Sequence, residues 1–398
     1  MKALVLKGKG KIAYIDKREP ELEALHGALL EPILVSPCTS DVHTIWQGSP
    51  KRDDLTLGHE VIARVKAAGE LVKDFKPGEI VAVSAITPDW GHPDVDENYA
   101  HAGQNFSAHM IGKSIDGAFQ SLFYLPFADK NLAHIPDGLS LEDALMCVDV
   151  VQTGFTAVEE AGVKSGDTVV VMGIGAIGLA AIMGSRMAGA KKIFAVGSRQ
   201  DNVRLAESMS DEFCSVEVLN YRDLKCSLPA GMHPLANSTG SPVVNYVLGK
   251  TGTKGADCVL LCGGNDLSFP QAVDMVKYGT GVVSNVMYYG ADIDVQDEEY
   301  VNLVNLKQGE ANAVIDAIQI PKFSMGRGMA GKTLKFSLSR GGRENLERVM
   351  KEVVKHGWHP SAFITKRYMG LDNIENAIYD MKDRKAIKIA VQLAKPEV

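Results

Sequence analysis

An apolar stretch that ends in glycines constrains the fold of this chain more than any other feature. Val169–Met172 is apolar and mostly β-branched, as in a strand buried on both faces, and it leads directly into Gly173, Gly175 and Gly178. The apolar segment Ile177–Met187 predicts a helix packed on that strand. A strand, a glycine turn with this spacing and a helix are together typical of a dinucleotide-binding site.

Each glycine of this motif has a separate physical reason. The first permits the turn, the second lets the backbone approach a pyrophosphate, and the third lets the helix pack against the strand. The N-terminus of the helix also favours the phosphate charge, because its backbone N–H groups point toward the ligand. We therefore predict that Gly173, Gly175 and Gly178 bind a nicotinamide dinucleotide.

The residues about 20 positions further along indicate which dinucleotide is preferred, since an NAD enzyme normally has Asp or Glu there. This chain has Gly197, Ser198 and Arg199 instead. A carboxylate would repel the 2′-phosphate of NADP, whereas glycine makes room, serine can form a hydrogen bond and arginine can pair with the dianion. The sequence therefore favours NADP over NAD.

The chain has 398 residues, more than one hydrophobic core usually holds, so two domains are expected. Short strands and turns predominate in the first part, and strands alternate with helices from Gly154 onward. We expect a β-rich domain at residues 1–152, completed by 294–398. Between them, 153–293 is predicted to form a doubly wound α/β domain with a parallel sheet.

Composition and charge fit an ordinary soluble globule, with 45% hydrophobic and 23% charged residues. The formal charge of -7 is spread without a basic block, which disfavours a nucleic-acid partner. Lys2 and Lys7 come too early for a secretory signal, and no apolar run approaches the roughly 20 residues of a membrane span. The six cysteines are too sparse for a disulfide scaffold, which indicates a reducing compartment. We expect a cytoplasmic protein that binds neither nucleic acid nor membrane.

Potential metal ligands surround the tripeptide Gly58-His59-Glu60, with Cys38 before it and Asp149 after it. A thiolate, an imidazole and a carboxylate can together hold a catalytic zinc ion and leave the fourth position open for substrate. Taken alone, Cys38 would usually be a buried thiol and His59 a hydrogen-bonded core histidine. A metal site combined with a nicotinamide site suggests an enzyme that transfers hydride.

These motifs also carry a family resemblance. The chain resembles the zinc-dependent medium-chain alcohol dehydrogenases, and it is most similar to the NADP-dependent secondary alcohol dehydrogenases. The resemblance covers nearly the whole chain except the region around 210–250. It rests on Pro37–Thr44, Leu57–Glu60, Asp74–Gly78, Ala85–Trp90, Asn131–His134, Val148–Asp149, Thr153–Phe155, Gly197–Arg199 and Asp372–Glu375.

The resemblance implies one catalytic zinc ion per subunit, bound by Cys38, His59 and Asp149. The assignment of Asp149 rests on alignment, and Cys147 is the nearby alternative. Glu60 is implied either to bind the ion when substrate is absent or to orient the ligands from behind. The segment 88–116 contains none of the closely spaced cysteines that hold a second, structural zinc in many relatives. His92, His101 and His109 in that segment are interpreted as loop or pocket-wall residues.

The resemblance also implies a proton path and a phosphate site. Ser40 is implied to accept the proton of the alcohol and His43 to relay it outward, a role that suits histidine because the unperturbed pKa of an imidazole is about 6.5. Ser40 as a helix cap and His43 as a solvated loop residue remain open alternatives. Tyr221 aligns with a tyrosine that lines the 2′-phosphate site, and an ordinary aromatic at a strand end remains the alternative.

The expected protein is thus an α/β oxidoreductase, in which a Rossmann domain is inserted into a β-rich GroES-like catalytic domain. It is predicted to transfer hydride between a secondary alcohol or ketone and NADP(H), and by resemblance to assemble as a homotetramer. One alternative is a zinc dehydrogenase for a primary alcohol, aldehyde or polyol. Another is a non-catalytic NADPH-binding protein with a structural or regulatory role.

Overall fold

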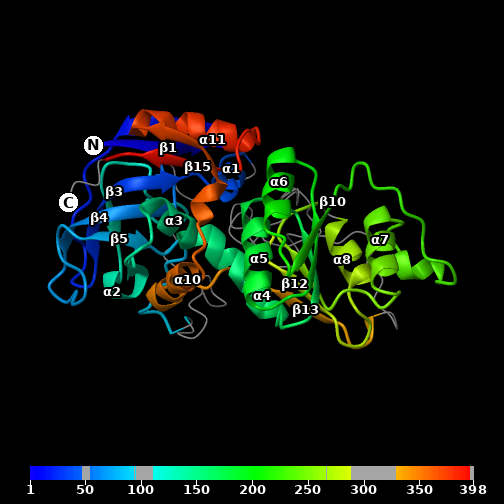
Figure 1. Cartoon of the computed structure of the whole chain (residues 1–398). Coiled ribbons are helices and arrows are strands. Elements are labelled where there is room, and N and C mark those ends of the chain that lie inside the picture. Colours follow the sequence, from blue (N-terminus) through cyan, green and yellow to red (C-terminus); the bar gives the residue numbers. More distant parts are fainter. Residues whose placement is uncertain (47–53, 94, 96–110, 266, 288–328, 395–398) are drawn as a thin grey trace. The chain divides into compact units, whose positions relative to one another are not determined.

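The computed structural model describes residues 1–46, 54–93, 95, 111–265, 267–287 and 329–394. These residues form two compact units. The first consists of 1–152 and 340–394, and the second of 153–287 and 329–339. In Figure 1, blue, cyan and red segments mark the first unit, and the second is mostly green and yellow.

A mostly antiparallel sheet forms the centre of the first unit. Within the described residues its strands follow in the order β14-β15-β3-β4-β5-β7, and β6 also pairs with β3. A separate hairpin pairs β1 (Lys2–Gly8) with β2 (Lys11–Asp16). The sheet strands are β3 (Ala28–Ser36), β4 (Glu60–Ala68), β5 (Ile80–Val83), β6 (Phe123–Leu125), β7 (Leu132–His134), β14 (Ile364–Met369) and β15 (Lys388–Gln392).

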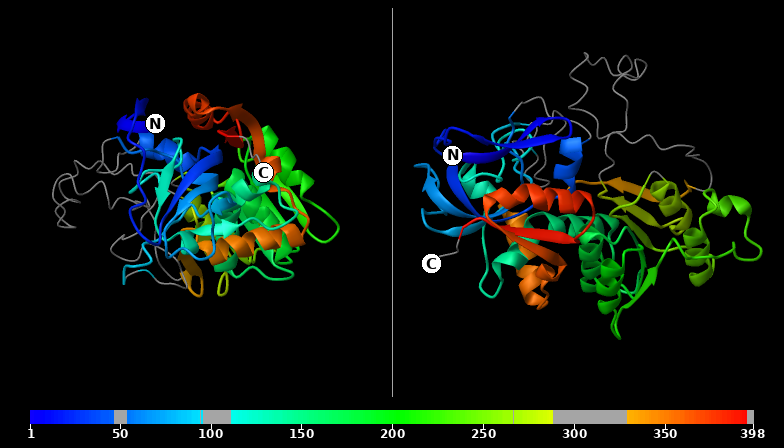
Figure 2. Two further views of the ribbon diagram at one scale, coloured as in Figure 1. Left: turned by 90° about the vertical axis from the view of Figure 1, so that its left-hand side faces the viewer. Right: turned by 90° about the horizontal axis from the view of Figure 1, so that it is seen from above.

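The two ends of the chain build this unit together. Strand β15, from the C-terminal part, lies beside β3 in the sheet, with Val391 opposite Val35. Figure 2 shows this red C-terminal segment together with the blue N-terminal strands. The helices of the unit are α1 (Thr39–Trp46), α2 (Ala128–Asn131), α3 (Leu141–Met146), α10 (Arg343–Lys355) and α11 (Ile374–Lys382), with a π-helical turn η1 (Cys147–Val151) and 3-10 turns η5 (Pro360–Phe363) and η6 (Leu371–Asn373).

The second unit contains a sheet in which all neighbouring strands are parallel. Its described strands follow in the order β10-β9-β8-β11-β12-β13, which is the 3-2-1-4-5-6 order of dinucleotide-binding folds. Apolar residues such as Val170, Phe194 and Val259 form its core. The strands are β8 (Thr168–Met172), β9 (Lys192–Val196), β10 (Ser215–Leu219), β11 (Cys258–Leu261), β12 (Val282–Asn285) and β13 (Thr333–Phe336). The helices are α4 (Gln152–Ala161), α5 (Ala176–Met187), α6 (Gln200–Ser208), α7 (Pro242–Lys250) and α8 (Ser268–Met275), with a 3-10 turn η2 (Pro234–Asn237).

Three neighbouring strands of this parallel sheet end at the same level. Met172, Val196 and Leu219 are paired in register, so the loops after β8, β9 and β10 leave the sheet side by side. In open α/β sheets, ligands bind at this carboxyl edge. The glycine motif, Gly197–Arg199 and Tyr221 all follow these strand ends.

The expected fold class, a doubly wound parallel sheet together with a β-rich domain, is confirmed. The 3-10 turn η6 leads directly into α11, which starts at Ile374. Between η2 and α7, the buried Asn237 side-chain amide donates to the Ser241 carbonyl at 2.8 Å and fixes the connection. Among the described residues, no helix is long and apolar enough to cross a membrane.

Candidate metal centre and dinucleotide site

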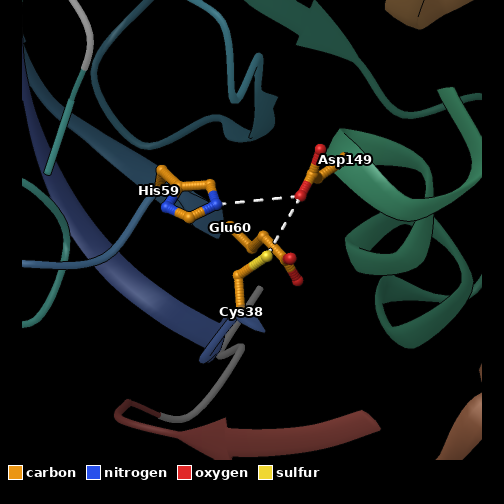
Figure 3. A group of neighbouring side chains, drawn as sticks. All are labelled: Cys38, His59, Glu60 and Asp149. Carbon is orange, nitrogen blue, oxygen red and sulfur yellow. Dashed lines mark hydrogen bonds and ion pairs between the residues drawn. The ribbon is translucent and has the colours of Figure 1, made fainter. Parts of the chain in front are cut away.

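Three elements of the first unit bring the predicted metal ligands together. Cys38 follows β3 and precedes α1, His59 directly precedes β4, and Asp149 lies in the π-helical turn η1. Because Ser36 pairs with Glu60, the end of β3 and the start of β4 lie at the same edge of the sheet. Figure 3 shows the four side chains Cys38, His59, Glu60 and Asp149 turned toward one another. We call these four residues the metal centre.

The spacing within the metal centre fits a zinc ion. One potential ligand atom from each of the four residues lies within 4.8 Å of the others. The Cys38 Sγ and Asp149 Oδ2 atoms are 3.5 Å apart, and His59 Nε2 and Asp149 Oδ2 are 3.7 Å apart. Ligands bound at about 2.0–2.3 Å to a tetrahedral zinc ion are separated by about 3.3–3.8 Å from one another. The thiolate, imidazole and carboxylate donors are also the types that zinc prefers.

Burial and the neighbouring charges shift the pKa values of the predicted ligands strongly. Burial and the Glu60 carboxylate raise the pKa of the Cys38 thiol, so a bound cation is what would keep this group deprotonated. Burial raises the pKa of Glu60 to about 7, although the Lys388 ammonium opposes this rise. Burial alone would lower the pKa of His59, but the Asp41 and Asp149 carboxylates raise it well above its ordinary value. The site is therefore rich in negative charge that a cation can balance.

Asp149, and not Cys147, belongs to the metal centre. Both lie in η1, but the Cys147 side chain is fully buried and outside the group of potential ligands found among the described residues. Burial raises the pKa of Cys147 far above its ordinary value, which keeps this thiol protonated and inert. Burial would likewise raise the pKa of Asp149, but His59 lowers it and keeps the carboxylate charged.

Two buried residues that the sequence did not single out support the ligands. Asp41 accepts a hydrogen bond from the Cys38 backbone N–H at 2.8 Å, and its Oδ1 lies 3.4 Å from His59 Nδ1. Lys388 places its Nζ 2.6 Å from Glu60 Oε1. The Cys-x-x-Asp spacing is a signal that could have identified Asp41. For Lys388 no local signal exists, because its partner is more than 300 positions away.

The two residues of the predicted proton path lie on α1. Ser40 is the second residue of this helix, and its Oγ is 3.2 Å from His59 Nε2. His43 follows after about one helical turn, so both residues share a face of α1. The Ser40 hydroxyl therefore borders the metal centre directly.

Gly58 is required by the backbone next to His59, one of the predicted ligands. Its φ angle of 96° is in the left-handed region, and an added Cβ atom would lie 2.4 Å from the Phe119 ring. A side chain at this position would force the adjacent ligand out of place.

In the second unit, the backbone around each of the three motif glycines explains why a glycine occupies that position. Gly173 has a φ of 83°, and a Cβ there would lie 2.5 Å from the Gly263 carbonyl oxygen. Gly175 immediately precedes α5 as its N-cap residue, with open space where a Cβ would be, so a ligand can approach its backbone. A Cβ at Gly178 would lie 1.9 Å from the Gly173 oxygen, which is the close contact of the helix with the turn.

The loops beside this motif hold the residues predicted to select NADP. Ser198 and Arg199 are half-buried, Arg199 immediately precedes α6, and Tyr221 follows β10 with 53% exposure. A Cβ on Gly197 would lie 2.1 Å from Ile174 Cγ1. The absence of a side chain at position 197 therefore leaves room for Ile174, which lies in the glycine motif. The sequence did not reveal Asn202, whose buried amide donates to the Ile174 carbonyl at 2.6 Å and fixes the turn.

Of the three histidines interpreted as loop or pocket-wall residues, His92 lies within the described residues. His92 lies in a described turn, where its backbone N–H donates to the Asp89 carbonyl at 2.9 Å. His101 and His109 lie outside the described residues.

Comparison with known proteins agrees with this geometry. Residues 26–137 match the model of the alcohol dehydrogenase GroES-like domain, and residues 176–311 match the model of the zinc-binding dehydrogenase domain. The chain is 35% identical to the NADP-dependent isopropanol dehydrogenase of Thermoanaerobacter brockii, over 96% of this chain and 97% of that protein. It is also 35% identical to the enzyme of the same name from Entamoeba histolytica, over 97% of this chain and 93% of that protein.

Solved structures share the fold at lower sequence identity. The alcohol dehydrogenase from Thermus sp. ATN1 superimposes with a TM-score of 0.76 at 22% identity, covering 99% of this chain and 100% of that one. A zinc-dependent alcohol dehydrogenase from Streptococcus pneumonia gives a TM-score of 0.76 at 20% identity, covering 100% of both chains.

Proposed function

This chain belongs to the zinc-dependent alcohol dehydrogenase family, and on that premise we propose that it interconverts secondary alcohols and ketones with NADP(H). Cys38, His59 and Asp149 would hold one zinc ion per subunit. The observation that carries this proposal is the spacing of 3.5 and 3.7 Å between the ligand atoms, which matches the edges of a zinc tetrahedron. The names of the relatives, NADP-dependent isopropanol dehydrogenases, support the substrate class and the cofactor.

The chemistry divides between the bound groups and the protein. Zinc supplies a Lewis acid for the substrate oxygen, and NADP(H) accepts or donates the hydride. The protein residues hold these groups in place and move the proton. Glu60 is proposed to orient the ligands or to occupy the fourth position when substrate is absent.

Ser40 and His43 are proposed to carry the proton away from the alcohol. The Ser40 hydroxyl lies 3.2 Å from His59 Nε2, so it borders the site in which the metal centre would hold the ion. His43 is one helical turn further along α1 and can take the proton outward. Each transfer then occurs between groups within hydrogen-bond reach or through one water molecule.

The preference for NADP is proposed to come from the loops after β9 and β10. Ser198 and Arg199 follow β9, and Tyr221 follows the neighbouring strand β10. Arginine can bind the 2′-phosphate through two parallel hydrogen bonds, and no carboxylate stands in 197–199 to repel it. Gly173, Gly175 and Gly178 are proposed to contact the pyrophosphate.

The organisation of the protein is proposed from the same resemblance. The unit of 1–152 and 340–394 acts as the catalytic domain, and the unit of 153–287 and 329–339 binds NADP; the boundary expected at 294 lies later because β13 pairs with β12 in the parallel sheet. The subunits assemble as a homotetramer, and the enzyme acts in the cytoplasm.

A substrate and cofactor panel tests the proposal. Initial rates are measured for the oxidation of 2-propanol, a primary alcohol and a polyol with NADP and with NAD, and for the reduction of an aldehyde with NADPH and with NADH. We expect the highest kcat/KM for 2-propanol with NADP. A higher value for a primary alcohol or polyol would assign the enzyme to another substrate class. Zinc-loaded protein that binds NADPH but turns over no substrate would support a non-catalytic role.

A further inference from the structure

Gln152 is a buried polar residue next to the turn that carries Asp149. It is 1% exposed and follows η1 directly, as the last residue of the first unit. Its Nε2 donates to the Val148 carbonyl at 2.5 Å, and its Oε1 accepts a hydrogen bond from Asn345 Nδ2 at 2.8 Å. A buried amide is costly unless it is hydrogen-bonded, and these contacts meet that need. The contact with Val148 also reaches the metal centre, because Val148 and Asp149 share a peptide bond.

The backbone of η1 explains why the Val148 carbonyl takes a side-chain donor. In an α-helix this carbonyl would accept from the backbone N–H of Gln152, four positions later. That N–H donates to the Asp149 carbonyl here, so the Gln152 side chain supplies a donor in its place. The backbone N–H of Ala85, after β5, donates to the same Val148 carbonyl at 3.3 Å. Two donors therefore fix the plane of the peptide bond that leads into Asp149.

The hydrogen bonds of this group run in one direction, from α10 to η1. Asn345 lies on α10, and its Oδ1 accepts from the Arg348 guanidinium at 2.8 Å. Its Nδ2 donates to Gln152 and to the Arg340 carbonyl, at 2.8 and 3.1 Å. A guanidinium can only donate and a backbone carbonyl can only accept, so neither amide can turn round without losing bonds at both ends. We call Gln152 and Asn345 the amide pair.

The position of the Asp149 carboxylate gives this rigidity a purpose. Asp149 Oδ2 is 3.5 Å from Cys38 Sγ and 3.7 Å from His59 Nε2, and Figure 3 shows the carboxylate reaching these side chains from a separate helical turn. Metal–ligand distances are held to within about 0.2 Å in a well-formed site. A rotation of the peptide bond before Asp149 would move the carboxylate by more than this tolerance.

We propose that Gln152 and Asn345 are positioning residues for the metal ligand Asp149. Asn345 sets the orientation of the Gln152 amide, and this amide holds the peptide bond before Asp149 so that the carboxylate faces the other ligands. The proposal rests on the zinc site of the proposed function, but not on the identity of the substrate or of the dinucleotide. Every residue of this group belongs to the first unit.

Cobalt(II) in place of zinc provides the test, because its absorption spectrum reports the ligand geometry independently of activity. Asn345→Asp replaces the donor that faces Gln152 with a carboxylate oxygen. The Gln152 amide then turns its Nε2 toward this oxygen and its Oε1 toward the Val148 carbonyl, where two acceptors repel each other. We expect a changed cobalt spectrum and, in competition with a chelator, a zinc affinity about 10–100-fold lower than that of wild type, the scale of outer-shell effects.

Asn345→Leu separates orientation from simple structural support. Leucine removes the donor to Gln152 but offers no acceptor, so Nε2 continues to donate to the Val148 carbonyl. We therefore expect a cobalt spectrum and a zinc affinity close to those of wild type. Equal changes in the two Asn345 variants would reduce the amide pair to structural support and overturn the proposal. A wild-type spectrum and zinc affinity in Asn345→Asp would overturn it as well.

Gln152→Leu removes the donor to the Val148 carbonyl itself and should lower the zinc affinity by the same factor of about 10–100. Because Asn345 acts through Gln152, adding Asn345→Asp to this variant should cause no further loss. A further loss as large as that of Asn345→Asp alone would contradict the proposal. Should Gln152→Leu fail to fold, the two Asn345 variants decide on their own.

Glu344→Gln, at an exposed position of α10, is the matched control and should behave as wild type in both measurements. Wild-type protein that binds neither cobalt nor zinc would refute the zinc site and the proposed function together. Normal metal binding by the wild type confines any failure to the amide pair.

Discussion

At the scale of single residues, the donors of the metal centre can be predicted, but their supports cannot. Cys38 and His59 stand in recognisable strings, and thiolate and imidazole are typical zinc ligands. Asp41 and Lys388 are residue types that are usually exposed. The Cys-x-x-Asp spacing is the one sequence signal for Asp41, and the sequence gives no reason to bury Lys388. The partner of Lys388 comes from a strand pairing between distant parts of the chain, which no local pattern encodes.

Asp41→Asn should weaken zinc binding about 10–100-fold, because Asp41 orients both the His59 ring and the Cys38 backbone. The measurement is zinc retention against a competing chelator. Asp16→Asn, at an exposed position of β2, is the matched control and should behave as wild type. Equal zinc retention in the Asp41 variant and the control would refute the supporting role.

Arg199→Asp should weaken binding of NADPH far more than binding of NADH, since a carboxylate repels the 2′-phosphate that the arginine is proposed to pair with. The dissociation constants of both cofactors are measured by titration. Arg204→Asp, an exposed substitution on the same helix α6, serves as the control. Equal losses for both cofactors in the Arg199 variant would eliminate the phosphate-binding role.

At the scale of elements, apolar strands and their helices are predictable because their patterns are local. Val169–Met172 and Ile177–Met187 were expected as a strand and a helix, and they coincide closely with β8 and α5. The π-helical turn that carries Asp149 was not expected, because no residue pattern distinguishes it from an ordinary helix. Strand β10 lies in the region around 210–250, where the amino-acid sequence departs from the resembled family. Its strand pattern is therefore weaker.

Helix α3 offers a test of how its N-terminus depends on pH. Asp143 is 1% exposed; burial alone would raise its pKa, but hydrogen bonds from Ser361 and Ser140 lower it below its ordinary value. A carboxyl group with a lowered pKa stabilises the fold above its unfolded pKa of about 3.9 and loses this effect as the pH falls through its folded pKa.

Asp143→Asn should therefore be less stable than wild type at pH 6, and the difference should shrink as the pH falls below about 4. Urea unfolding of both proteins at pH 6, 4 and 3 measures it. A difference in the free energy of unfolding that stays constant across these pH values would show that the charge of Asp143 does not contribute.

At the scale of the whole molecule, each compact unit contains one of the two predicted sites. The metal centre lies entirely in the unit built from 1–152 and 340–394, and the glycine motif lies in the unit built from 153–287 and 329–339. This distribution of the two sites follows from the fold classes of the two units, and the sequence already indicated both fold classes. The sequence analysis expected the C-terminal part to complete the first domain, but it could not supply the pairing of β15 with β3, because no local pattern encodes a pairing between the two ends of the chain.

Each ligand should consequently protect its own unit from hydrogen exchange. Adding NADP at 100 times its dissociation constant stabilises the native state by about 2.7 kcal/mol. We expect slower exchange around 173–178 and 197–203 on NADP binding, and faster exchange around 38–46, 59–65 and 147–152 on zinc removal. Zinc removal that leaves exchange in these last three segments unchanged would contradict the location of the metal.

The most direct test of the central claim is the initial rate of 2-propanol oxidation with NADP, in zinc-loaded protein, after zinc removal by a chelator and after zinc is added back. The account predicts that the rate falls to background without zinc and returns when one zinc ion per subunit is restored. Metal-free protein that oxidises 2-propanol at the rate of the zinc-loaded protein would contradict it.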